Sequence, residues 1–392
     1  MTDASGTLAG IVERADAIYR DYSLPTVRDW KARTGGLAVG FMPIYVPCEI
    51  LHAQGVLPVG MMGARDDLEI IKGDAYYQSY ICHIPRSTIE LGLSGRIDCL
   101  DGMLFPAICD VIRNLSGMWQ MLFPSKLVRY LDVPQNFEPE IGGRFYRHEL
   151  EDLAQSLADR GARPYDPEAL RASIAVYNAL RSEVRGLYAL RAREPWKVPT
   201  SELYLLLRAS LVIPAEDAVV MFRQYRQLVS ADTSRTPLDQ ARVMLTGSFC
   251  EQPPIGLIRT LERAGCYIVD DDFVQVHRFI QSDIPTDGDP LEQLVRAFLS
   301  DAMASPTRYI DKGVKGADLV LRVQRSQAEG VLFCAPSFCD PALLDQPMAV
   351  RAIEAQQVPW TAFKYAENTG QFQVIREQAG TFADSIKLWS PA

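Results

Sequence analysis

Residues 37–61 read LAVGFMPIYVPCEILHAQGVLPVGM. The stretch begins with a short apolar run typical of a buried β-strand, passes through a turn that contains proline, and continues for about a dozen residues with helical spacing of its apolar side chains. Gly55 stands where such a helix would end, and a second apolar run follows it. The pattern predicts a strand, helix and strand unit, which is the building block of a parallel α/β sheet.

A second stretch with the same order covers residues 242–270, RVMLTGSFCEQPPIGLIRTLERAGCYIVD. Two prolines mark the start of its expected helix, and Gly265 marks the end. The likeness extends to two glycine-led apolar strands, at 101–110 and 329–340, which both end in Cys-Asp. We therefore expect an α/β protein with two related doubly wound domains, each with a mostly parallel sheet.

Between the two units, residues 146–235 carry charged and apolar side chains at helical spacing, with several prolines as breaks. This stretch predicts a helical insert between the domains. We expect residues 1–30 to form an N-terminal helical segment, residues 31–145 the first α/β domain and residues 236–392 the second. The insert is expected to be a packed helical layer, because no cluster of titratable residues stands out in it.

The composition indicates a cytoplasmic protein with a large core. Of the 392 residues, 48% are hydrophobic and 23% are charged, and the formal net charge is −9. This balance does not favour nucleic acid or a membrane surface as partner, since both require a dense cationic face. No run reaches the roughly 20 apolar residues of a membrane span, and the opening MTDASGTLAGIVERAD lacks the basic start and apolar core of a signal peptide. In the cytoplasm, the eight cysteines would be reduced thiols.

Three of these cysteines fall where an α/β sheet commonly binds ligands. Cys109 and Cys339 each follow a strand, at the carboxyl end where the loops leave for the helices. Cys82 stands in a loop before a helical run, where the helix dipole favours its thiolate. Two half-repeats that face each other would bring these loops to one cleft. The other five are expected to be core or near-core thiols, with the two in the turns that open the repeated helices the first to reconsider: Cys48 and Cys250, then Cys99, Cys266 and Cys334.

Five motifs along nearly the whole chain beyond residue 30 carry a family resemblance. They are PCEILHAQGVLPVG at 47–60, Cys82 followed by Arg86, the strand that ends in Cys109 and Asp110, TGSFCEQP at 246–253 with AGCYIVDDD at 264–272, and GVLFCAPSFCDP at 330–341. This combination resembles the benzoyl-CoA reductase and 2-hydroxyacyl-CoA dehydratase family. The length and the wording around Cys82 are most similar to the smaller substrate-binding subunit of the ATP-dependent reductases.

The resemblance implies a [4Fe–4S] cluster held by three cysteines, which by motif are Cys82, Cys109 and Cys339. The fourth iron would be open or exogenously ligated, as suits an iron that meets a substrate. The resemblance also implies a hetero-oligomer with a second related substrate-binding subunit, a separate ATP-hydrolysing iron–sulfur activator, and ferredoxin as the electron donor. The chain has no GxxxxGK[ST] loop, so ATP is expected to act on another subunit.

The implied activity is the delivery of low-potential electrons to the aromatic ring of an acyl-CoA substrate, benzoyl-CoA. The product would be a cyclic dienoyl-CoA, as in the anaerobic degradation of aromatic compounds. Two alternatives stay open. One is a subunit of a 2-hydroxyacyl-CoA dehydratase, in which the same one-electron input forms a ketyl radical, and the other is a non-catalytic scaffold subunit without a cluster.

Two residues are candidates for proton transfer. By resemblance, Glu49 is the carboxylate for a catalytic proton role on the substrate side. His83 follows the first expected ligand, where small hydroxyl residues are common in the family, and it would donate a proton or tune hydrogen bonding to a cluster sulfur. A surface or capping histidine is the alternative for His83. The acidic triplet Asp270–Asp272 is expected to be a solvated turn rather than a metal site.

Overall fold

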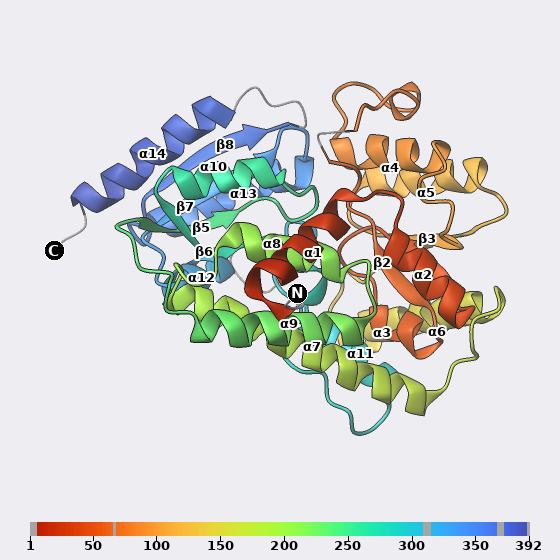
Figure 1. Ribbon diagram of the computed structural model, residues 1–392. Helices are drawn as coiled ribbons and strands as arrows, with labels where there is room; N and C mark the ends of the chain where they lie inside the picture. Colours follow the sequence, from red (N-terminus) through yellow and green to blue (C-terminus); the bar gives the residue numbers. More distant parts are fainter. Residues whose placement is uncertain (1–5, 66–67, 309–314, 367–371, 390–392) are drawn as a thin grey trace.

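Two four-stranded parallel sheets form the framework of the computed structural model, which describes residues 6–65, 68–308, 315–366 and 372–389 (Figure 1). The strand order in the first sheet is β2 (Leu57–Gly60), β1 (Ala38–Phe41), β3 (Gly102–Pro106) and β4 (Leu127–Leu131). In the second sheet it is β6 (Cys266–Asp271), β5 (Ala241–Thr246), β7 (Gly330–Pro336) and β8 (Trp360–Tyr365). Every strand pair in these two sheets is parallel, which confirms the predicted fold class.

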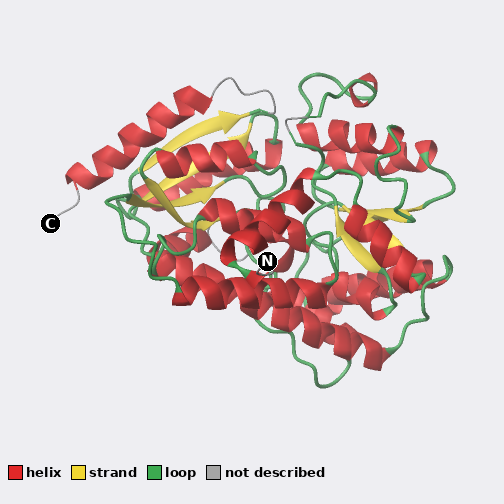
Figure 2. Ribbon diagram, viewed as in Figure 1, coloured by secondary structure: helices red, strands yellow, loops and turns green. Residues whose placement is uncertain are grey.

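Helices surround both sheets (Figure 2). α3 (Cys48–Ala53), α4 (His83–Leu93) and α5 (Asp110–Leu122) lie around the first sheet, and α10 (Ile255–Arg263), α12 (Ala317–Ser326), α13 (Asp340–Glu354) and α14 (Phe372–Trp389) lie around the second. α11 (Pro290–Ser300) packs mainly against other helices rather than against either sheet. The remaining elements are α1 (Leu8–Arg20), α2 (Pro25–Thr34), α6 (Arg144–Ala158), α7 (Pro167–Arg193), α8 (Thr200–Ser210), α9 (Ala215–Ala231), and the short turns η2 (Gly73–Ala75), η3 (Pro139–Gly143) and η4 (Gln275–His277). Across the described ranges, no helix has both the length and the apolar character that crossing a bilayer requires.

The first strand, helix and strand unit forms as predicted, except that its helix is shorter. α3 has six residues and begins after Pro47, and the residues between Pro43 and Pro47 lie outside any helix. Proline disfavours the helical conformation in the residue before it, which explains the late start. Gln54 ends the helix and Gly55 follows with φ of 73°, a left-handed conformation that glycine adopts without strain.

The two sheets share one topology, and that topology creates two equivalent crevices. The strand order reverses between β1 and β3 in the first domain and between β5 and β7 in the second. β3 and β7 are buried along their whole lengths, as strands covered by helices on both faces must be. Loops that leave a sheet on either side of such a reversal diverge and leave room for a ligand.

The longest helix, α7, connects the two domains, and Figure 1 shows it reaching from the second sheet toward α3. Arg181 of α7 forms an ion pair with Glu49 of α3 at 2.6 Å. Ten residues further on, Arg191 forms an ion pair with Asp271 of β6, also at 2.6 Å. Both ion pairs are buried. The helical insert therefore contributes two buried arginines to these pairs, although its sequence showed no cluster of titratable residues. The predicted domain limits stay a prediction.

The expectation that Asp270–Asp272 form a solvated turn is wrong. Asp271 is 1% exposed, and the Arg322 guanidinium of α12 bonds to Asp270 at 2.9 Å and to Asp272 at 2.6 Å. Burial by itself would raise the pKa of Asp270, but Arg322 more than offsets this and holds that pKa below its usual range. The triplet therefore anchors α12 and α7 to the end of β6. A nearby partner is Arg278, which bonds to Asp271 at 3.1 Å. Arg322 and Arg191 lie about 50 and 80 residues away in the chain, which no local pattern reveals.

Candidate metal centre at three helix N-termini

Each of the three predicted ligand cysteines is the N-cap of a helix. Cys82 precedes α4, Cys109 precedes α5 and Cys339 precedes α13. Cys109 follows β3 and Cys339 follows β7, at the carboxyl ends of the two central strands. The first turn of a helix presents unpaired N–H groups and a partial positive charge, which stabilise a thiolate.

The structure brings these three thiols into one neighbourhood, although they come from both domains. After burial, the charge of Glu251 and then those of Cys339 and Cys109 raise the pKa of Cys82, and Glu251 and Cys109 act in the same way on Cys339. Cys82 and Cys109 together also raise the pKa of Tyr77, after burial as the main cause. The two crevices of the fold therefore meet at one site.

Burial is the main influence on the thiols, and the helix amides oppose it. Burial raises the pKa of Cys82 well above its usual value, raises that of Cys109, and raises that of Cys339 to about 12. The backbone N–H groups of Val111 and Ile112 lower the pKa of Cys109 in part, and that of Ala342 does so for Cys339. Thiols in this state ionise when a metal binds them, because metal ligation replaces the proton.

A hydrogen bond across the domain boundary closes one side of the site. The backbone N–H of His83, the first residue of α4, donates to the carboxylate of Glu251 at 3.0 Å. Glu251 lies in the loop after β5, and the hydroxyl of Tyr365 on β8 holds its backbone carbonyl at 2.6 Å. The loop of the second domain is thus fixed against the helix that begins at Cys82.

The two predicted proton-transfer residues lie in different places. His83 is buried beside the cysteines, its Nε2 is 3.0 Å from the carbonyl oxygen of Ala64, and it lines a small pocket together with Glu251. Glu49 is buried on α3, where its carboxylate accepts a hydrogen bond from Arg181. Of the two, His83 is the one that the structure places next to the predicted ligands.

A fourth cysteine, which the sequence analysis counted among near-core thiols, joins the group. Cys250 precedes Glu251, is 8% exposed, and interacts electrostatically with Cys339, Cys109 and Cys82. The signal that could have found it is a repeat, because Cys-Glu occurs after the first strand in both units, at 48–49 and at 250–251.

The three predicted ligands are all thiols, the kind of donor that iron–sulfur clusters use. Thiolates are the protein ligands of such clusters, and each thiolate binds a different iron, so the sulfurs stand apart around the cluster. Within the residues that the structure describes, no three His, Cys, Asp or Glu side chains lie close enough to hold one metal ion. Cys82, Cys109 and Cys339, with Cys250 beside them, are the residues available to hold a cluster.

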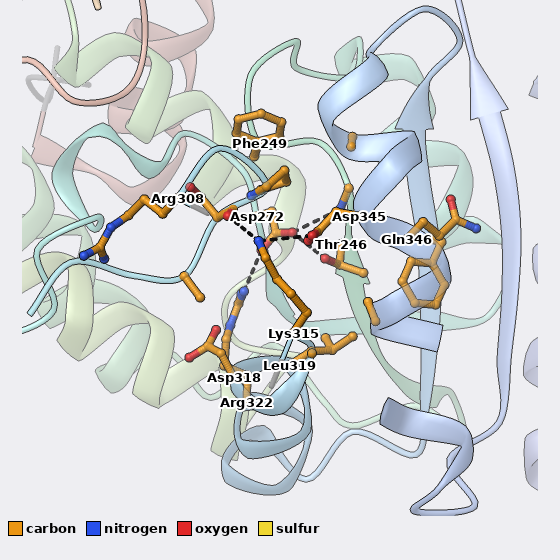
Figure 3. Close-up of a pocket in the computed structure, with 18 of the residues that line it drawn as sticks. Thr246, Phe249, Asp272, Arg308, Lys315, Asp318, Leu319, Arg322, Asp345 and Gln346 are labelled. Atoms are coloured by element: carbon orange, nitrogen blue, oxygen red, sulfur yellow. Dashed lines mark hydrogen bonds and ion pairs between the residues drawn. The ribbon is translucent and has the colours of Figure 1, made fainter. Parts of the chain in front are cut away.

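An open cleft with a cavity volume of about 170 Å³ adjoins this site in the second domain (Figure 3). Its wall includes Thr246 at the end of β5 and Ala342 in the first turn of α13, the helix that begins at Cys339. Lys315 points into the cleft, where its Nζ lies 3.1 Å from Asp345 of α13. This volume is smaller than the roughly 300–1,000 Å³ of a typical small-molecule site, so the cleft could receive only part of a large ligand.

Comparison with known proteins assigns the family. The family model described as 2-hydroxyglutaryl-CoA dehydratase, D-component, matches residues 43–386. The chain is 53% identical to one of the subunits of benzoyl-CoA reductase of Thauera aromatica, over 97% of this chain and 99% of that protein. The chain belongs to the benzoyl-CoA reductase and 2-hydroxyacyl-CoA dehydratase family. The resemblance drawn from the motifs is thereby confirmed.

Two further members of the benzoyl-CoA reductase and 2-hydroxyacyl-CoA dehydratase family are more distant. The chain is 28% identical to lactoyl-CoA dehydratase subunit beta of Anaerotignum propionicum, over 91% of this chain and 94% of that protein. It is 25% identical to (R)-2-hydroxyglutaryl-CoA dehydratase subunit beta of Acidaminococcus fermentans, over 90% of this chain and 93% of that protein. All three relatives are named as subunits, and the chain is accordingly a subunit of an enzyme complex of this family.

Proposed function

We propose that this chain is the cluster-carrying subunit of an ATP-dependent benzoyl-CoA reductase. It would deliver low-potential electrons to the aromatic ring of benzoyl-CoA and so form a cyclic dienoyl-CoA. The cofactor is a [4Fe–4S] cluster held by Cys82, Cys109 and Cys339. The reductase is favoured over a dehydratase because the reductase relative is 53% identical, against 28% and 25% for the two dehydratase relatives.

One observation carries this proposal. The thiols of Cys82, Cys109 and Cys339 are separated by up to about 260 residues in sequence, yet the charges of Cys109 and Cys339 act on the pKa of Cys82. Each of the three stands at the N-terminus of a different helix. A structural core has no need to gather thiols in this way, whereas an anionic, thiolate-ligated cluster does. This arrangement also speaks against a scaffold subunit without a cluster.

When bound, the cluster supplies electrons one at a time at low potential. The chain's own residues set the conditions for this. Cys339 is buried, whereas Cys82 and Cys109 are partly exposed, and the environment of an iron–sulfur cluster sets its potential. The N–H groups at the three helix starts stabilise the negative charge of the thiolates.

Proton transfer is assigned to two residues. His83 follows Cys82 directly and lines the small pocket beside it, which supports a proton role close to the cluster. Glu49 of α3, which pairs with Arg181 of α7, is proposed for a proton role on the substrate side. Reduction of one ring by two electrons also consumes two protons, so the complex needs proton donors of this kind.

The proposed partners follow from the proposed reaction. They are a second related substrate-binding subunit, an ATP-hydrolysing iron–sulfur activator, ferredoxin as electron donor and benzoyl-CoA as substrate, all in the cytoplasm. The cleft beside α13 is the place where this chain would receive part of an acyl-CoA, since it adjoins the cysteine site and Lys315 points into it.

The decisive experiment is an electron count. The complex is assembled without oxygen from this chain, its partner subunit and the activator, and it is given ATP, reduced ferredoxin and benzoyl-CoA. Two electrons should be consumed for each dienoyl-CoA formed. Full turnover of a 2-hydroxyacyl-CoA with only a trace of electrons, and no reduction of benzoyl-CoA, would instead identify a dehydratase.

A further inference from the structure

We propose that His52 is a positioning residue for Glu49, which it holds in place through the hydroxyl of Ser173 while both of its ring nitrogens carry a proton. The inference rests on the proposed function, because Glu49 is the carboxylate proposed there for a proton role on the substrate side. It adds a residue that acts on Glu49 through the backbone, and a protonation state on which this action depends.

The residues involved lie on facing sides of two helices that pack together. Glu49 and His52 are three residues apart on α3, so they share one side of that helix. Ser173, Tyr177 and Arg181 follow one another at intervals of four residues on α7 and likewise form one row. α3 packs against α7, and hydrogen bonds join the two rows. The first domain is therefore attached to the helical insert at Glu49.

α7 holds Glu49 at both its backbone and its side chain. The hydroxyl of Ser173 donates to the carbonyl oxygen of Glu49 at 2.8 Å, and the guanidinium of Arg181 donates to its carboxylate at 2.6 Å. Arg181 is fixed in turn by a 2.8 Å bond to Oδ1 of Asn178. Glu49, Ser173 and Arg181 are all buried, so water does not compete for these bonds.

The Ser173 hydroxyl determines that Nδ1 of His52 carries a proton. Nδ1 lies 2.8 Å from Oγ of Ser173. A hydroxyl has one proton to give, and Ser173 gives it to the carbonyl oxygen of Glu49, which can only accept. The oxygen of Ser173 is therefore the acceptor in its bond with His52, and Nδ1–H is the donor.

The second ring nitrogen carries a proton as well. Nε2 lies 3.0 Å from Oε1 of Glu216 on α9. The bond with His52 is the main cause that lowers the pKa of the Glu216 carboxyl, so this group is ionised near neutral pH and accepts the bond. His52 is thus an imidazolium when all three bonds are made.

The titratable groups around the ring balance this charge. They come from the four elements α3, α7, α9 and η4, and they are Cys48, Glu49, Tyr177, Arg181, Glu216 and His277. Burial raises the pKa of Cys48 and of Tyr177 and lowers that of His277 to about 4, so these three are uncharged at neutral pH. Two ion pairs remain, His52 with Glu216 and Arg181 with Glu49.

Loss of one ring proton would release Glu49. An ordinary imidazole titrates at about pH 6.5, and a neutral ring keeps only one N–H. A bond to a charged acceptor is stronger than a bond to a neutral one, so the neutral ring keeps the proton that faces Glu216. The Ser173 hydroxyl then turns to Nδ1, and the carbonyl oxygen of Glu49 loses its donor.

The second repeat restrains its own glutamate in a related way. There the hydroxyl of Tyr365 donates to the backbone carbonyl oxygen of Glu251 at 2.6 Å. Four residues after its cysteine, however, the second repeat has Pro254 where the first has His52. A hydroxyl that holds the glutamate backbone is common to both halves, whereas its control by a titratable ring belongs to the first half alone.

The first test is the turnover of benzoyl-CoA per folded complex, assembled without oxygen with its partner subunits. His52→Leu and Ser173→Ala should each lower kcat by about tenfold with KM unchanged, a part of the roughly 10²–10⁴-fold that a positioned proton donor contributes. Ser173→Thr keeps the hydroxyl and should restore kcat. His148→Leu is the matched control, because His148 is exposed on α6.

The second test follows the ring protons of His52 by nitrogen-15 NMR of the histidine-labelled full chain, which has four histidines. At about pH 6 wild type should show two protonated ring nitrogens, and at higher pH only Nε2–H. Glu216→Ala should instead keep Nδ1–H, because Ser173 is then the only acceptor left. Turnover should fall over the same rise in pH in wild type, relative to Glu216→Ala.

The outcomes separate this inference from the proposed function. Wild-type turnover in His52→Leu and Ser173→Ala, together with a loss in Glu49→Gln, would overturn the role of His52 alone. The same neutral tautomer in wild type and Glu216→Ala would also overturn it, and this measurement needs neither cluster nor turnover. Full turnover in Glu49→Gln would remove the proton role of Glu49 and the use of His52 with it, whereas the electron count would still decide the reductase assignment.

Discussion

The N–H of His83 donates a 3.0 Å hydrogen bond to the carboxylate of Glu251, and this bond joins the two α/β domains at the cysteine site. It caps the N-terminus of α4, whose N-cap residue Cys82 makes no side-chain capping bond of its own. A carboxylate at a helix N-terminus is favourable because it meets unpaired N–H groups and the positive end of the dipole. The position of Cys82 therefore depends on a residue of the second domain.

Removing this cap should destabilise the chain. Glu251→Ala is expected to lower the free energy of unfolding by about 1 kcal/mol, the usual cost of losing an N-cap, while Glu251→Gln should lose less because its amide oxygen still accepts the bond. Urea unfolding followed by circular dichroism gives both values. Equal losses in the two variants would show that the carboxylate does not act as a cap.

The three N-cap cysteines should each be needed for the cluster. Cys82→Ser, Cys109→Ser and Cys339→Ser are each expected to reduce iron and acid-labile sulfide by more than about half, since a thiolate ligand is lost. Cys266→Ser is the control, because Cys266 is buried at the start of β6 and only burial affects the pKa of its thiol. Cluster content that is unchanged in all three ligand variants would remove the proposed cluster site.

The Glu49 and Arg181 pair should matter for stability, because it is buried. Arg181→Met leaves the Glu49 carboxylate unpaired in the interior, and we expect a loss of about 3–5 kcal/mol in urea unfolding. Arg185→Met is the control on the same helix, since its pair with Asp283 is largely exposed and should contribute about 0–1 kcal/mol.

The same pair also tests the proton role of Glu49. Glu49→Gln should lower the turnover of the folded complex with benzoyl-CoA more than Arg181→Met does. This outcome is expected because only the first change removes the carboxyl group that would exchange a proton. Equal turnover per folded complex in both variants would leave Glu49 with a packing role only.

Buried His277 should make stability depend on pH. Burial, followed by the nearby charge of Arg181, lowers its pKa to about 4 from an ordinary value near 6.5. The unfolded chain therefore binds a proton at a higher pH than the folded chain, so stability is fully present above about pH 6.5 and falls as the pH drops toward 4. Between pH 7 and pH 5 this residue should account for a loss of about 2 kcal/mol.

The measurement compares urea unfolding of wild type and His277→Gln at several pH values. The variant lacks the titrating ring, so its stability should fall less steeply over this range. Parallel curves for the two proteins would show that His277 titrates alike in the folded and unfolded chains.

Local patterns in the chain were enough to predict the repeated architecture and the setting of the cysteines. Apolar runs, helical spacing and turn residues such as Gly55 predicted two parallel-sheet domains. The placement of Cys82, Cys109 and Cys339 at strand ends and helix starts followed from the same patterns. These features can be read from the sequence because backbone hydrogen bonds and side-chain periodicity act over only a few residues.

Which polar residues meet, in contrast, depends on the packing of distant segments. The folded chain separates Cys250 from its counterpart Cys48, joins Glu251 to His83 across 168 residues, and buries Asp271 against Arg191 where a solvated turn was expected. Such contacts depend on how two domains and α7 pack against one another. That packing is set by the burial of apolar surface between segments far apart in the chain. Such burial fixes where side chains lie in space, but it produces no regular spacing of residues that could be read from the sequence.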